Sequence, residues 1–547
     1  MVSKSEILTP LMKQYYGFKR EHPDKIIFFR MGDFYEMFGE DAIKAAPILG
    51  VTLTSRSGAN ADHREPLAGV PYHSAEKYLS KLLRAGEKVV VVEQVEDPKT
   101  AKGIVKRDIV EILTPGTSTL EDETSKNASS YLAAIHPGSE KISGMAYLEM
   151  STAEFKVMDG SDEQIAERMA ILNPREIIFP ESTDDKTLEK FLNGSSSRRK
   201  YSRLDNYHFD RAIAEEELKR FFDVTALDGF GLGDTNLALG AGGAILRYLK
   251  ENRRDTLDHI NRISCVEKDS RMSLDSATVR NLELVEPLGH GDTGISLFDV
   301  IDKTITPGGA RRLKRDLVEP FLKIEPIRKR QEAVGIARSD REGANEIRKT
   351  LRIVPDLARL AGRLGIRRFS PRQALSLGQG LQAGREIVSK LKDSGSELLQ
   401  SLIRTSPDTA LVSEKLISGL TENPPLLTGQ GGIIRKGASA ELDKLNEAIA
   451  SAKNYMAGLQ NSEREATGIP TLRVGFNKVF GYYLEITHKH KNRIPERYIR
   501  KQTLVNAERY ITEEMKVQED LIQAAEEKIH KLERELFEKL VEDLIEH

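Results

Sequence analysis

The clearest hydrophobic periodicity lies in the last third of the chain. Apolar residues there step by three or four positions in two stretches, which places each set on one face of a long helix. The first set is Leu442, Leu445, Ile449, Ala452, Met456 and Leu459, and the second is Val517, Leu521, Ala525, Ile529, Leu532, Leu536, Leu540 and Leu544. Between them, residues 472–474 and 479–486 have the apolar and aromatic pattern of strands. The pattern predicts two long helices that run out and back around a small β module.

The first 117 residues mix strand and helix patterns. Apolar runs at 25–30 and 87–92 have the length and residue types of strands, and residues 74–85 have helical spacing. The turn residues Thr114–Thr117 close this stretch. The pattern predicts an α+β module.

The middle of the chain predicts a second module followed by helices. Strand patterns at 144–148, 154–157 and 176–180, with a helical segment at 165–172, are typical of an α/β layer domain. From about Leu239 onward the chain becomes helical, for example at 310–317 and 324–336.

Length and charge restrict what such a chain does. Its 547 residues predict roughly three to four domains. The formal net charge is −2, so any nucleic acid must be held by local basic patches. One such patch is the β module, where residues 472–510 contain nine Lys or Arg and three Glu, with His488 and His490. A charge run of this kind can also be a plain solvated face.

Several classes of protein are disfavoured. Cys265 is the single cysteine, which excludes an internal disulfide framework and a cysteine-based zinc site. The N-terminus lacks a signal core, and no run approaches the ~18 apolar residues of a membrane helix. We therefore expect a soluble, cytoplasmic protein without a membrane partner.

Catalytic motifs are absent from the sequence. Gly289–Gly294 is rich in glycine, but Ile295 stands where a phosphate-binding loop has its lysine. No His-Glu-x-x-His pair or similar metal-ligand constellation occurs. We expect no catalytic residue, no cofactor and no metal on this chain.

The segment Gly32–Phe38 is the candidate binding device. Phe34 and Phe38 are four residues apart, so composition alone favours a short helix with both rings in the core. Asp33 would then be its N-cap and Glu36 its first-turn partner. The alternative is an exposed aromatic side chain that contacts a ligand.

Motifs along the chain decide between these interpretations. Phe28–Phe38 resembles the signature of the mismatch-recognition domain of the MutS family, and other segments resemble the same family in the same order. These are Leu67–His73, Glu93–Pro98 and Leu113–Thr117 in the first domain, Leu297–Asp302 and Thr306–Arg311 in the core, and Val474–Tyr483 and Asn506–Tyr510 in the clamp.

The resemblance implies a role for two residues of the first motif. In the family, the Phe of Phe-x-Glu stacks at the mismatch and the Glu hydrogen-bonds the displaced base; here these are Phe34 and Glu36. A wedge offsets an unstacking cost of a few kcal/mol, which is smallest where pairing is already broken. Such recognition depends on DNA deformability. Glu36 either accepts from a base N–H, or its pKa rises and it donates as a neutral acid.

The clamp resemblance gives the basic patch a role in phosphate contact, which positions DNA without reading its sequence. The candidates are Lys489, Lys491, Arg493, Arg497, Arg500 and Lys501. Arg56, expected in a loop near the wedge, is a further candidate.

The resemblance also predicts the fold class and domain boundaries. The expected class is multidomain α+β and α/β. The expected parts are a mixed α/β mismatch-binding domain at 1–117, an α/β connector at 118–262, a mostly helical core with a lever at 263–452, a small β-rich clamp at 453–513, and a second lever helix at 514–547. The sequence ends in a helical pattern, so we expect a truncated chain.

The expected partners follow from the family. They are double-stranded DNA with mispairs or small bulges, MutL, and a second copy in the full-length homodimer; this chain alone is expected to be monomeric. ATP and Mg²⁺ belong to the family's ATPase domain, which we expect to be missing. The expected location is the cytoplasm, in association with the nucleoid.

Two other functions remain open. One is a branched- or duplex-DNA-binding module without mismatch preference, which would be indifferent to Phe34. The other is a nuclease, which would need clustered carboxylates around a divalent metal, and the sequence has no such cluster.

Overall fold

The structure is a computed structural model. It describes residues 9–57, 64–96, 103–118, 130–192, 200–233, 235–253, 257–267, 271–288, 294–477 and 481–546. The predictions for Gly58, for 289–293 and for 478–480 lie outside these residues. The chain forms two compact units: residues 1–368 with 386–406, and residues 369–385 with 407–547.

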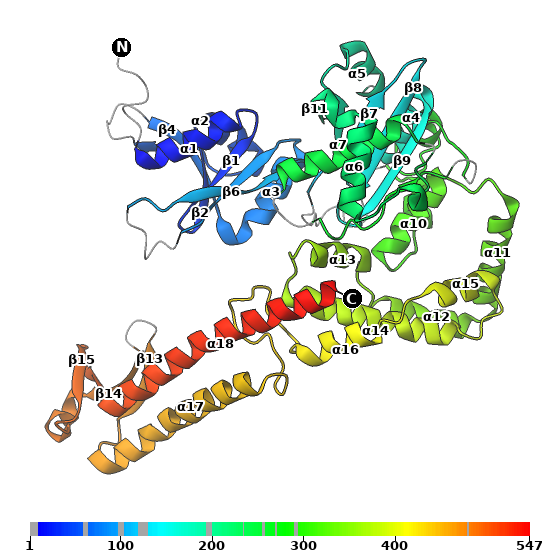
Figure 1. The fold of residues 1–547 in the computed structure, drawn as a ribbon. Coiled ribbons are helices and arrows are strands. Elements are labelled where there is room, and N and C mark those ends of the chain that lie inside the picture. Colours follow the sequence, from blue (N-terminus) through cyan, green and yellow to red (C-terminus); the bar gives the residue numbers. More distant parts are fainter. Residues whose placement is uncertain are drawn as a thin grey trace, which may run out of the picture. The chain divides into compact units, whose positions relative to one another are not determined.

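The first sheet has six strands in the order β3-β4-β2-β1-β5-β6 (Figure 1). The strands are β1 (Ile26–Met31), β2 (Phe34–Phe38), β3 (Thr54–Ser57), β4 (Arg64–Pro71), β5 (Val89–Gln94) and β6 (Arg107–Leu113), and the helices are α1 (Pro10–Glu21), α2 (Gly39–Leu49) and α3 (Ala75–Arg84). The predicted strands at 25–30 and 87–92 are β1 and β5, which pair in parallel, and the predicted helix is α3.

The first four residues of strand β1, Ile26–Phe29, are apolar and buried because both faces of the sheet are covered there. Ile26 and Phe28 belong to the core formed with α2 and α3. Ile27 and Phe29 belong to the core on the opposite face, with Tyr15 of α1. Alternating side chains therefore fill two cores, which explains the continuous apolar run.

The second sheet has the order β11-β10-β7-β8-β9-β12. Its strands are β7 (Tyr131–Pro137), β8 (Ile142–Glu149), β9 (Glu154–Ser161), β10 (Glu176–Pro180), β11 (Lys200–Leu204) and β12 (Ser264–Cys265), with α4 (Asp162–Leu172), α5 (Asp185–Leu192), α6 (Arg211–Phe222) and α7 (Leu237–Asn252). The predicted α/β layer module is confirmed.

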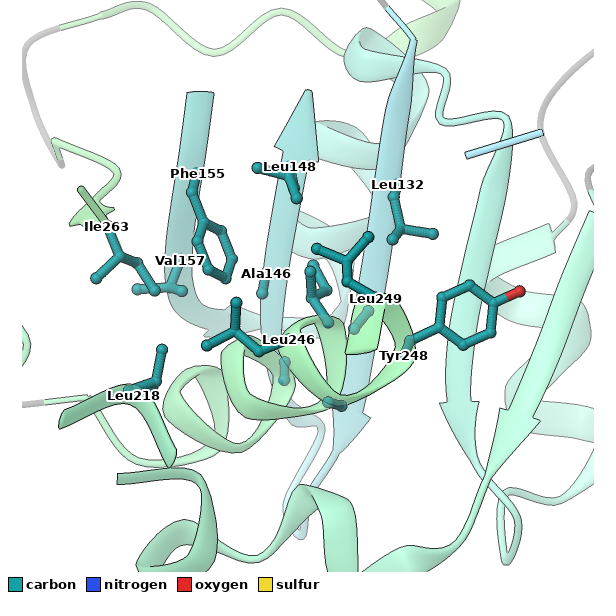
Figure 2. Packing of buried hydrophobic residues seen from close by; sticks show 14 of the residues in the cluster. Leu132, Ala146, Leu148, Phe155, Val157, Leu218, Leu246, Tyr248, Leu249 and Ile263 are labelled. Carbon is teal, nitrogen blue, oxygen red and sulfur yellow. The ribbon is translucent and has the colours of Figure 1, made fainter. Parts of the chain in front are cut away.

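Helix α7 is the centre of this module. Figure 2 shows Leu246 and Leu249 of α7 packed toward Leu132, Leu148 and Phe155 of the sheet. The helix is buried on almost all sides, and its glycines permit close approach. A Cβ on Gly243 would lie 2.5 Å from the Cβ of Ala214 in α6.

The two sheets are joined through buried polar contacts. Glu176 of β10 is fully buried and accepts hydrogen bonds from Ser202 (2.7 Å) and Tyr248 (2.6 Å). Lys88, which precedes β5, lies 3.3 Å from the same carboxylate. Burial raises the pKa of Glu176, but Lys88 and the hydrogen bonds outweigh burial, so its pKa lies below the usual value. The buried carboxylate of Glu176 therefore links the first module to the second.

The rest of the first unit is helical. Its helices are α8 (Ser276–Asn281), α9 (Leu297–Ile301), α10 (Pro307–Val318), α11 (Ile324–Ser339), α12 (Arg341–Leu351), α13 (Leu357–Gly365) and α15 (Glu397–Thr405), while α14 (Pro371–Leu391) spans the unit boundary. The helices predicted at 310–317 and 324–336 are α10 and α11. A Cβ on Gly365 would overlap His259, so α13 packs closely against the second module.

The second unit contains α16 (Ala410–Gly419) and two long helices, α17 (Ala440–Thr467) and α18 (Glu513–Ile545). Helices α17 and α18 lie side by side (Figure 1). A four-stranded sheet is inserted between them in the chain, in the order β13-β14-β16-β15. Its strands are β13 (Arg473–Asn477), β14 (Gly481–Thr487), β15 (Ile499–Thr503) and β16 (Ala507–Ile511). No helix in the described part of the chain is long and apolar enough to cross a membrane.

Two details of this unit differ from the sequence prediction. The pattern predicted strands only at 472–474 and 479–486, and missed β15 and β16. The predicted apolar face of α17 is correct, whereas Val517 and Leu521 of α18 are 56% and 44% exposed.

Candidate nucleic-acid interface

The candidate wedge begins at a tight hairpin. Strands β1 and β2 pair antiparallel with Met31 opposite Phe34, so Gly32 and Asp33 form a two-residue turn. Gly32 has φ +55°, which glycine adopts without the steric cost of a Cβ. The prediction of a short helix at 33–38 is wrong, because these residues form strand β2 and Asp33 caps no helix.

The strand places Phe34, Glu36 and Phe38 on one face. Phe38 is 1% exposed and its ring packs edge-on against Tyr15 of α1, with centroids 4.9 Å apart. Phe34, at the hairpin end of the same face, is 48% exposed. The two rings were expected together in a helical core, and only Phe38 is in a core.

Phe34 and Glu36 are brought together over a glycine. Gly69 of β4 pairs with Glu36. A Cβ on Gly69 would lie 3.7 Å from Cγ of Glu36 and 3.9 Å from Cδ1 of Phe34. The Phe34 ring and the stem of Glu36 therefore lie next to each other over the same backbone position, at ordinary contact distance from it.

The opposite face of the hairpin holds a polar network that the sequence prediction missed. Arg30 lies 3.8 Å from the ring centroid of Tyr72 and donates from Nε to the Gly32 carbonyl at 2.5 Å. Tyr35 donates to Glu93, and burial together with this bond raises the Tyr35 pKa. Tyr72 is 43% exposed. The network fixes the turn that carries Phe34, and its cross-strand contacts leave no periodic signal in the sequence.

Arg56 was expected in a loop, which is a second correction. Its backbone lies in strand β3, opposite Glu65 of β4. The side chain of Arg56 is outside the described residues, so its contact with DNA stays a prediction.

The six cations that the sequence predicted to contact phosphate are all exposed, and they lie in two segments of the small β module. Lys489, Lys491 and Arg493 lie on a 3-10 turn (His488–Arg493), and Arg497, Arg500 and Lys501 lie at or just before β15. The structure brings all six of these predicted residues into one module.

Carboxylates hold three of these cations. Glu463 of α17 is 3% exposed and pairs with Arg497 at 2.6 Å. Glu508 of β16, also 3% exposed, pairs with Lys491 at 3.3 Å and with Arg500 at 3.7 Å. A hydrogen bond from the Tyr510 hydroxyl lowers the pKa of Glu508.

The other three cations have no carboxylate partner within the described residues. Arg493 donates to the carbonyl of Gly468 at 3.1 Å. Lys489 and Lys501 form no ion pair or hydrogen bond with the described residues. These two ammonium groups are the most accessible to an incoming anion. Phe476 of β13, 60% exposed, adds an aromatic surface to the same module.

In the part of the chain that the structure describes, no group of three or more His, Cys, Asp or Glu side chains is arranged to hold a metal ion.

Together, these features define a multidomain protein of two α/β modules, connecting helices and a β module carried between two long helices. The family model of MutS domain I matches residues 9–122, that of MutS domain II matches 130–261, and that of MutS domain III matches 277–547. The chain belongs to the MutS family, as its motifs predicted.

Curated relatives agree with this assignment. The chain is 41% identical over 539 residues to the DNA mismatch repair protein MutS of Parabacteroides distasonis, an alignment that covers 98% of this chain and 61% of that protein. It is 39% identical over 545 residues to the DNA mismatch repair protein MutS of Thermodesulfovibrio yellowstonii, covering 100% of this chain and 62% of that protein. The chain thus spans about three fifths of the length of the curated relatives it matches.

Proposed function

We propose that this chain recognises mispaired or bulged DNA as part of DNA mismatch repair. The observation that carries the proposal is the exposed Phe34 ring next to Glu36 on a fixed hairpin. A single exposed apolar side chain is common on protein surfaces. A half-exposed ring beside a carboxylate, on a strand locked by Arg30 and Tyr72, is a more specific arrangement.

Phe34 acts as the wedge in this proposal. An inserted ring must offset the loss of base stacking, and that cost is smallest at a mispair or bulge. Because Arg30 bonds to the turn at Gly32, the backbone that carries the ring should lose little conformational freedom on binding. Glu36, on the same face, then bonds to the edge of the displaced base.

The small sheet acts as a clamp on the phosphate backbone. Lys489, Lys491, Arg493, Arg497, Arg500 and Lys501 supply its positive charge, and Arg56 adds to the wedge side. Such contacts make affinity fall with salt and carry no sequence information.

The domain assignment follows the same proposal. Residues 1–117 form the mismatch-binding domain, 118–262 the connector, 263–452 the core with the first lever helix, 453–513 the clamp and 514–547 the second lever helix. MutL and a second copy of the protein are the proposed partners. Coupling to ATP and Mg²⁺ is proposed to reside in a family domain outside these residues, since no phosphate-binding loop motif occurs in this sequence.

A second candidate is binding of duplex or branched DNA without mismatch preference. The cation-rich sheet favours it, because backbone contacts alone hold any duplex. The two candidate functions make different predictions for Phe34: only mismatch recognition requires its ring for a preference for defective duplexes.

The test compares binding to a matched duplex, a G·T mismatch and a one-base bulge for the parent, Phe34→Ala and Phe476→Ala. The Phe476→Ala control removes another exposed ring, which lies in the small sheet and is 60% exposed against 48% for Phe34. Stacking on an aromatic side chain contributes about 1–3 kcal/mol per base, so we expect Phe34→Ala to lower the preference for defective duplexes about tenfold. Phe476→Ala should keep that preference.

Equal binding of the parent to all three duplexes, with loss of binding at higher salt, would instead establish the second candidate. A preference that survives in Phe34→Ala would exclude Phe34 as the wedge.

A further inference from the structure

One buried carboxylate of the small sheet holds two of the cations that the proposed function assigns to the phosphate backbone. Glu508 of β16 is 3% exposed, and its Oε1 lies 3.3 Å from Nζ of Lys491 and 3.7 Å from Nη1 of Arg500. The two cations are themselves open to solvent over 60% and 59% of their side-chain surface. Two positive charges and one negative charge leave this cluster at a net +1.

The strand fixes Glu508 at this place. Glu508 is the register partner of Ile486 in β14, and Tyr510, two residues further on, is the partner of Leu484. Side chains two residues apart lie on the same face of a strand, so Glu508 is on the face that carries the apolar core of the sheet. The Tyr510 hydroxyl donates to Oε2 of Glu508, and the two cations approach Oε1.

Glu508 carries its negative charge near neutral pH. The hydrogen bond from Tyr510 lowers the pKa of its carboxyl group, and the contacts with Lys491 and Arg500 lower that pKa further, against the effect of burial. Carboxylate and phosphate oxygens bind to ammonium and guanidinium groups in the same way. A phosphate that reaches Lys491 or Arg500 must therefore displace the carboxylate of Glu508 or share the cation with it.

We propose that Glu508 limits the affinity of the small sheet for DNA phosphates by holding Lys491 and Arg500, and that it does so equally for matched and defective duplexes. This inference rests on the proposed function, in which the small sheet contacts the phosphate backbone. Backbone contacts carry no information on base pairing, so a carboxylate that weakens them lowers the affinity for every duplex by the same factor. The protein then stays for a shorter time at each matched site, because affinity differences between related complexes lie mostly in the dissociation rate.

The first experiment compares the parent with Glu508→Gln at several salt concentrations, by fluorescence anisotropy with a matched duplex and a one-base bulge. Glutamine keeps the size of the side chain and an oxygen that accepts from Tyr510, and it removes the charge. Release of two ion pairs with exposed cations should raise the affinity for both duplexes at low salt by about threefold to tenfold. The slope of log affinity against log salt should steepen by about 0.9 for each cation that gains a phosphate contact. The ratio of bulge to matched affinity should equal that of the parent.

The control variant is Glu496→Gln, which separates release of the two cations from a general loss of negative charge. Glu496 belongs to the same module, is exposed, and forms no ion pair with the described residues. Its substitution changes the net charge as much as Glu508→Gln does. We expect a smaller gain in affinity and in slope from Glu496→Gln.

A second pair of variants tests the proposal with Glu508 in place. Lys489 and Lys491 lie on the same 3-10 turn, and Lys489 has no carboxylate partner among the described residues. Lys489→Gln should reduce the salt slope by about 0.9, and Lys491→Gln should reduce it by less. Arg500 still pairs with Glu508 in Lys491→Gln, so the buried carboxylate keeps a cation.

Tighter and more salt-dependent binding by Glu508→Gln, with an unchanged bulge ratio, supports the proposal. An affinity gain no larger than that of Glu496→Gln, or an equal loss of slope in Lys489→Gln and Lys491→Gln, overturns it. A fall in affinity with an unchanged circular dichroism melt also overturns it, because Glu508 would then order the two cations for phosphate. If Glu508→Gln melts below the parent, the comparison of Lys489→Gln with Lys491→Gln decides. The bulge preference of the parent tests mismatch recognition separately, since it does not enter these comparisons of affinity and slope.

Discussion

Phe34 and Phe38 are the same residue type on the same face of one strand, and only their neighbours distinguish them. Helix α1 covers the end of β2 that carries Phe38, through Tyr15. The hairpin end extends beyond this cover, which leaves the Phe34 ring half exposed. The difference between a core ring and a half-exposed ring here is a matter of four residues along a strand.

A substitution at Glu36 should change the discrimination between mismatched and matched DNA more than it changes the overall affinity for DNA. Glu36→Gln removes the negative charge and keeps the size, so general attraction to DNA should rise or stay level. Its role at the displaced base edge, by contrast, depends on the carboxyl group. We expect the ratio of mismatch to matched affinity to fall by about threefold to tenfold, within the range of one hydrogen bond to a charged group.

Competition binding with matched and G·T duplexes measures this ratio. The control is Glu40→Gln, which removes an exposed carboxylate from the first turn of the neighbouring helix α2. A variant that discriminates as well as the parent would rule out the role of Glu36.

At the scale of residues the wedge role of Phe34 stays a prediction, and the helical conformation that its spacing predicted is wrong. The motif around Phe34 pointed to a wedge, whereas the spacing of Phe34 and Phe38 favoured a helix. The strand arises from nonlocal pairing with β1 and β4, which a local pattern does not record. Arg30 and Tyr72 were missed for the same reason.

At the scale of elements, the small sheet combines its cations with buried carboxylates. Glu508 shares its charge between Lys491 and Arg500, and Glu463 holds Arg497. An anion that approaches these three must compete with an existing partner. Lys489 and Lys501 have no such competitor among the described residues.

The double variant Lys489→Ala/Lys501→Ala should therefore change the salt dependence of DNA binding. Each lost phosphate contact reduces the slope of log affinity against log salt by about 0.9, so the double variant should lose about two units of slope. Binding at several salt concentrations, measured by fluorescence anisotropy with a matched duplex, gives the slope.

The matched control is Lys528→Ala/Lys539→Ala, which removes two exposed lysines from α18 outside the sheet. An unchanged slope in Lys489→Ala/Lys501→Ala, or an equal change in the control, would contradict phosphate contact by the sheet.

The buried face of helix α18 differs from the apolar face that the sequence predicted, whereas in helix α17 the two agree. Its buried face includes Glu533, which is 2% exposed and accepts hydrogen bonds from the backbone N–H groups of Ile433 and Ile434 at 2.9 and 3.1 Å. A hydrophobic pattern skips a charged residue, so the predicted face ran through Leu532 and Leu536 instead of Glu533 and Phe537. Helix α17 also buries one carboxylate, Glu463, but this residue follows the last predicted apolar position, Leu459, so the face of α17 was predicted correctly.

At the scale of the first unit, the modules are joined by buried polar groups. Glu111 of β6 pairs with Arg253 at the end of α7 and with Arg368 after α13. Glu176 joins Lys88 to the second sheet. Removing one partner of a buried pair leaves an uncompensated charge, so these modules should unfold together. Such contacts between distant parts of the sequence could not be predicted from spacing.

His259 makes the stability of this junction sensitive to pH. It lies against Gly365 of α13 and is 2.9 Å from the carbonyl oxygen of Met150. Burial lowers its pKa from 6.5 to about 4. The unfolded chain therefore binds the proton more readily, and the stability contribution that is present above pH 6.5 is lost as pH falls toward 4.

At about pH 5 the expected loss is up to about 2 kcal/mol. Urea unfolding at neutral pH and at about pH 5 should show a smaller pH effect in His259→Gln than in the parent. His490→Gln, which changes a histidine of the small sheet, is the control. The same pH effect in parent and His259→Gln would disprove this role.

The insertion of a sheet between α17 and α18 also governs the order in which this unit assembles. Residues such as Leu442 and Ile529 meet in one core although a long stretch of chain separates them. Closing so long a loop costs conformational entropy before the contact stabilises anything. The sheet forms from neighbouring strands such as β13 and β14, so its closure is local. A sheet that forms first would let the two helices start from adjacent points, so we expect the helix pair to form after the sheet.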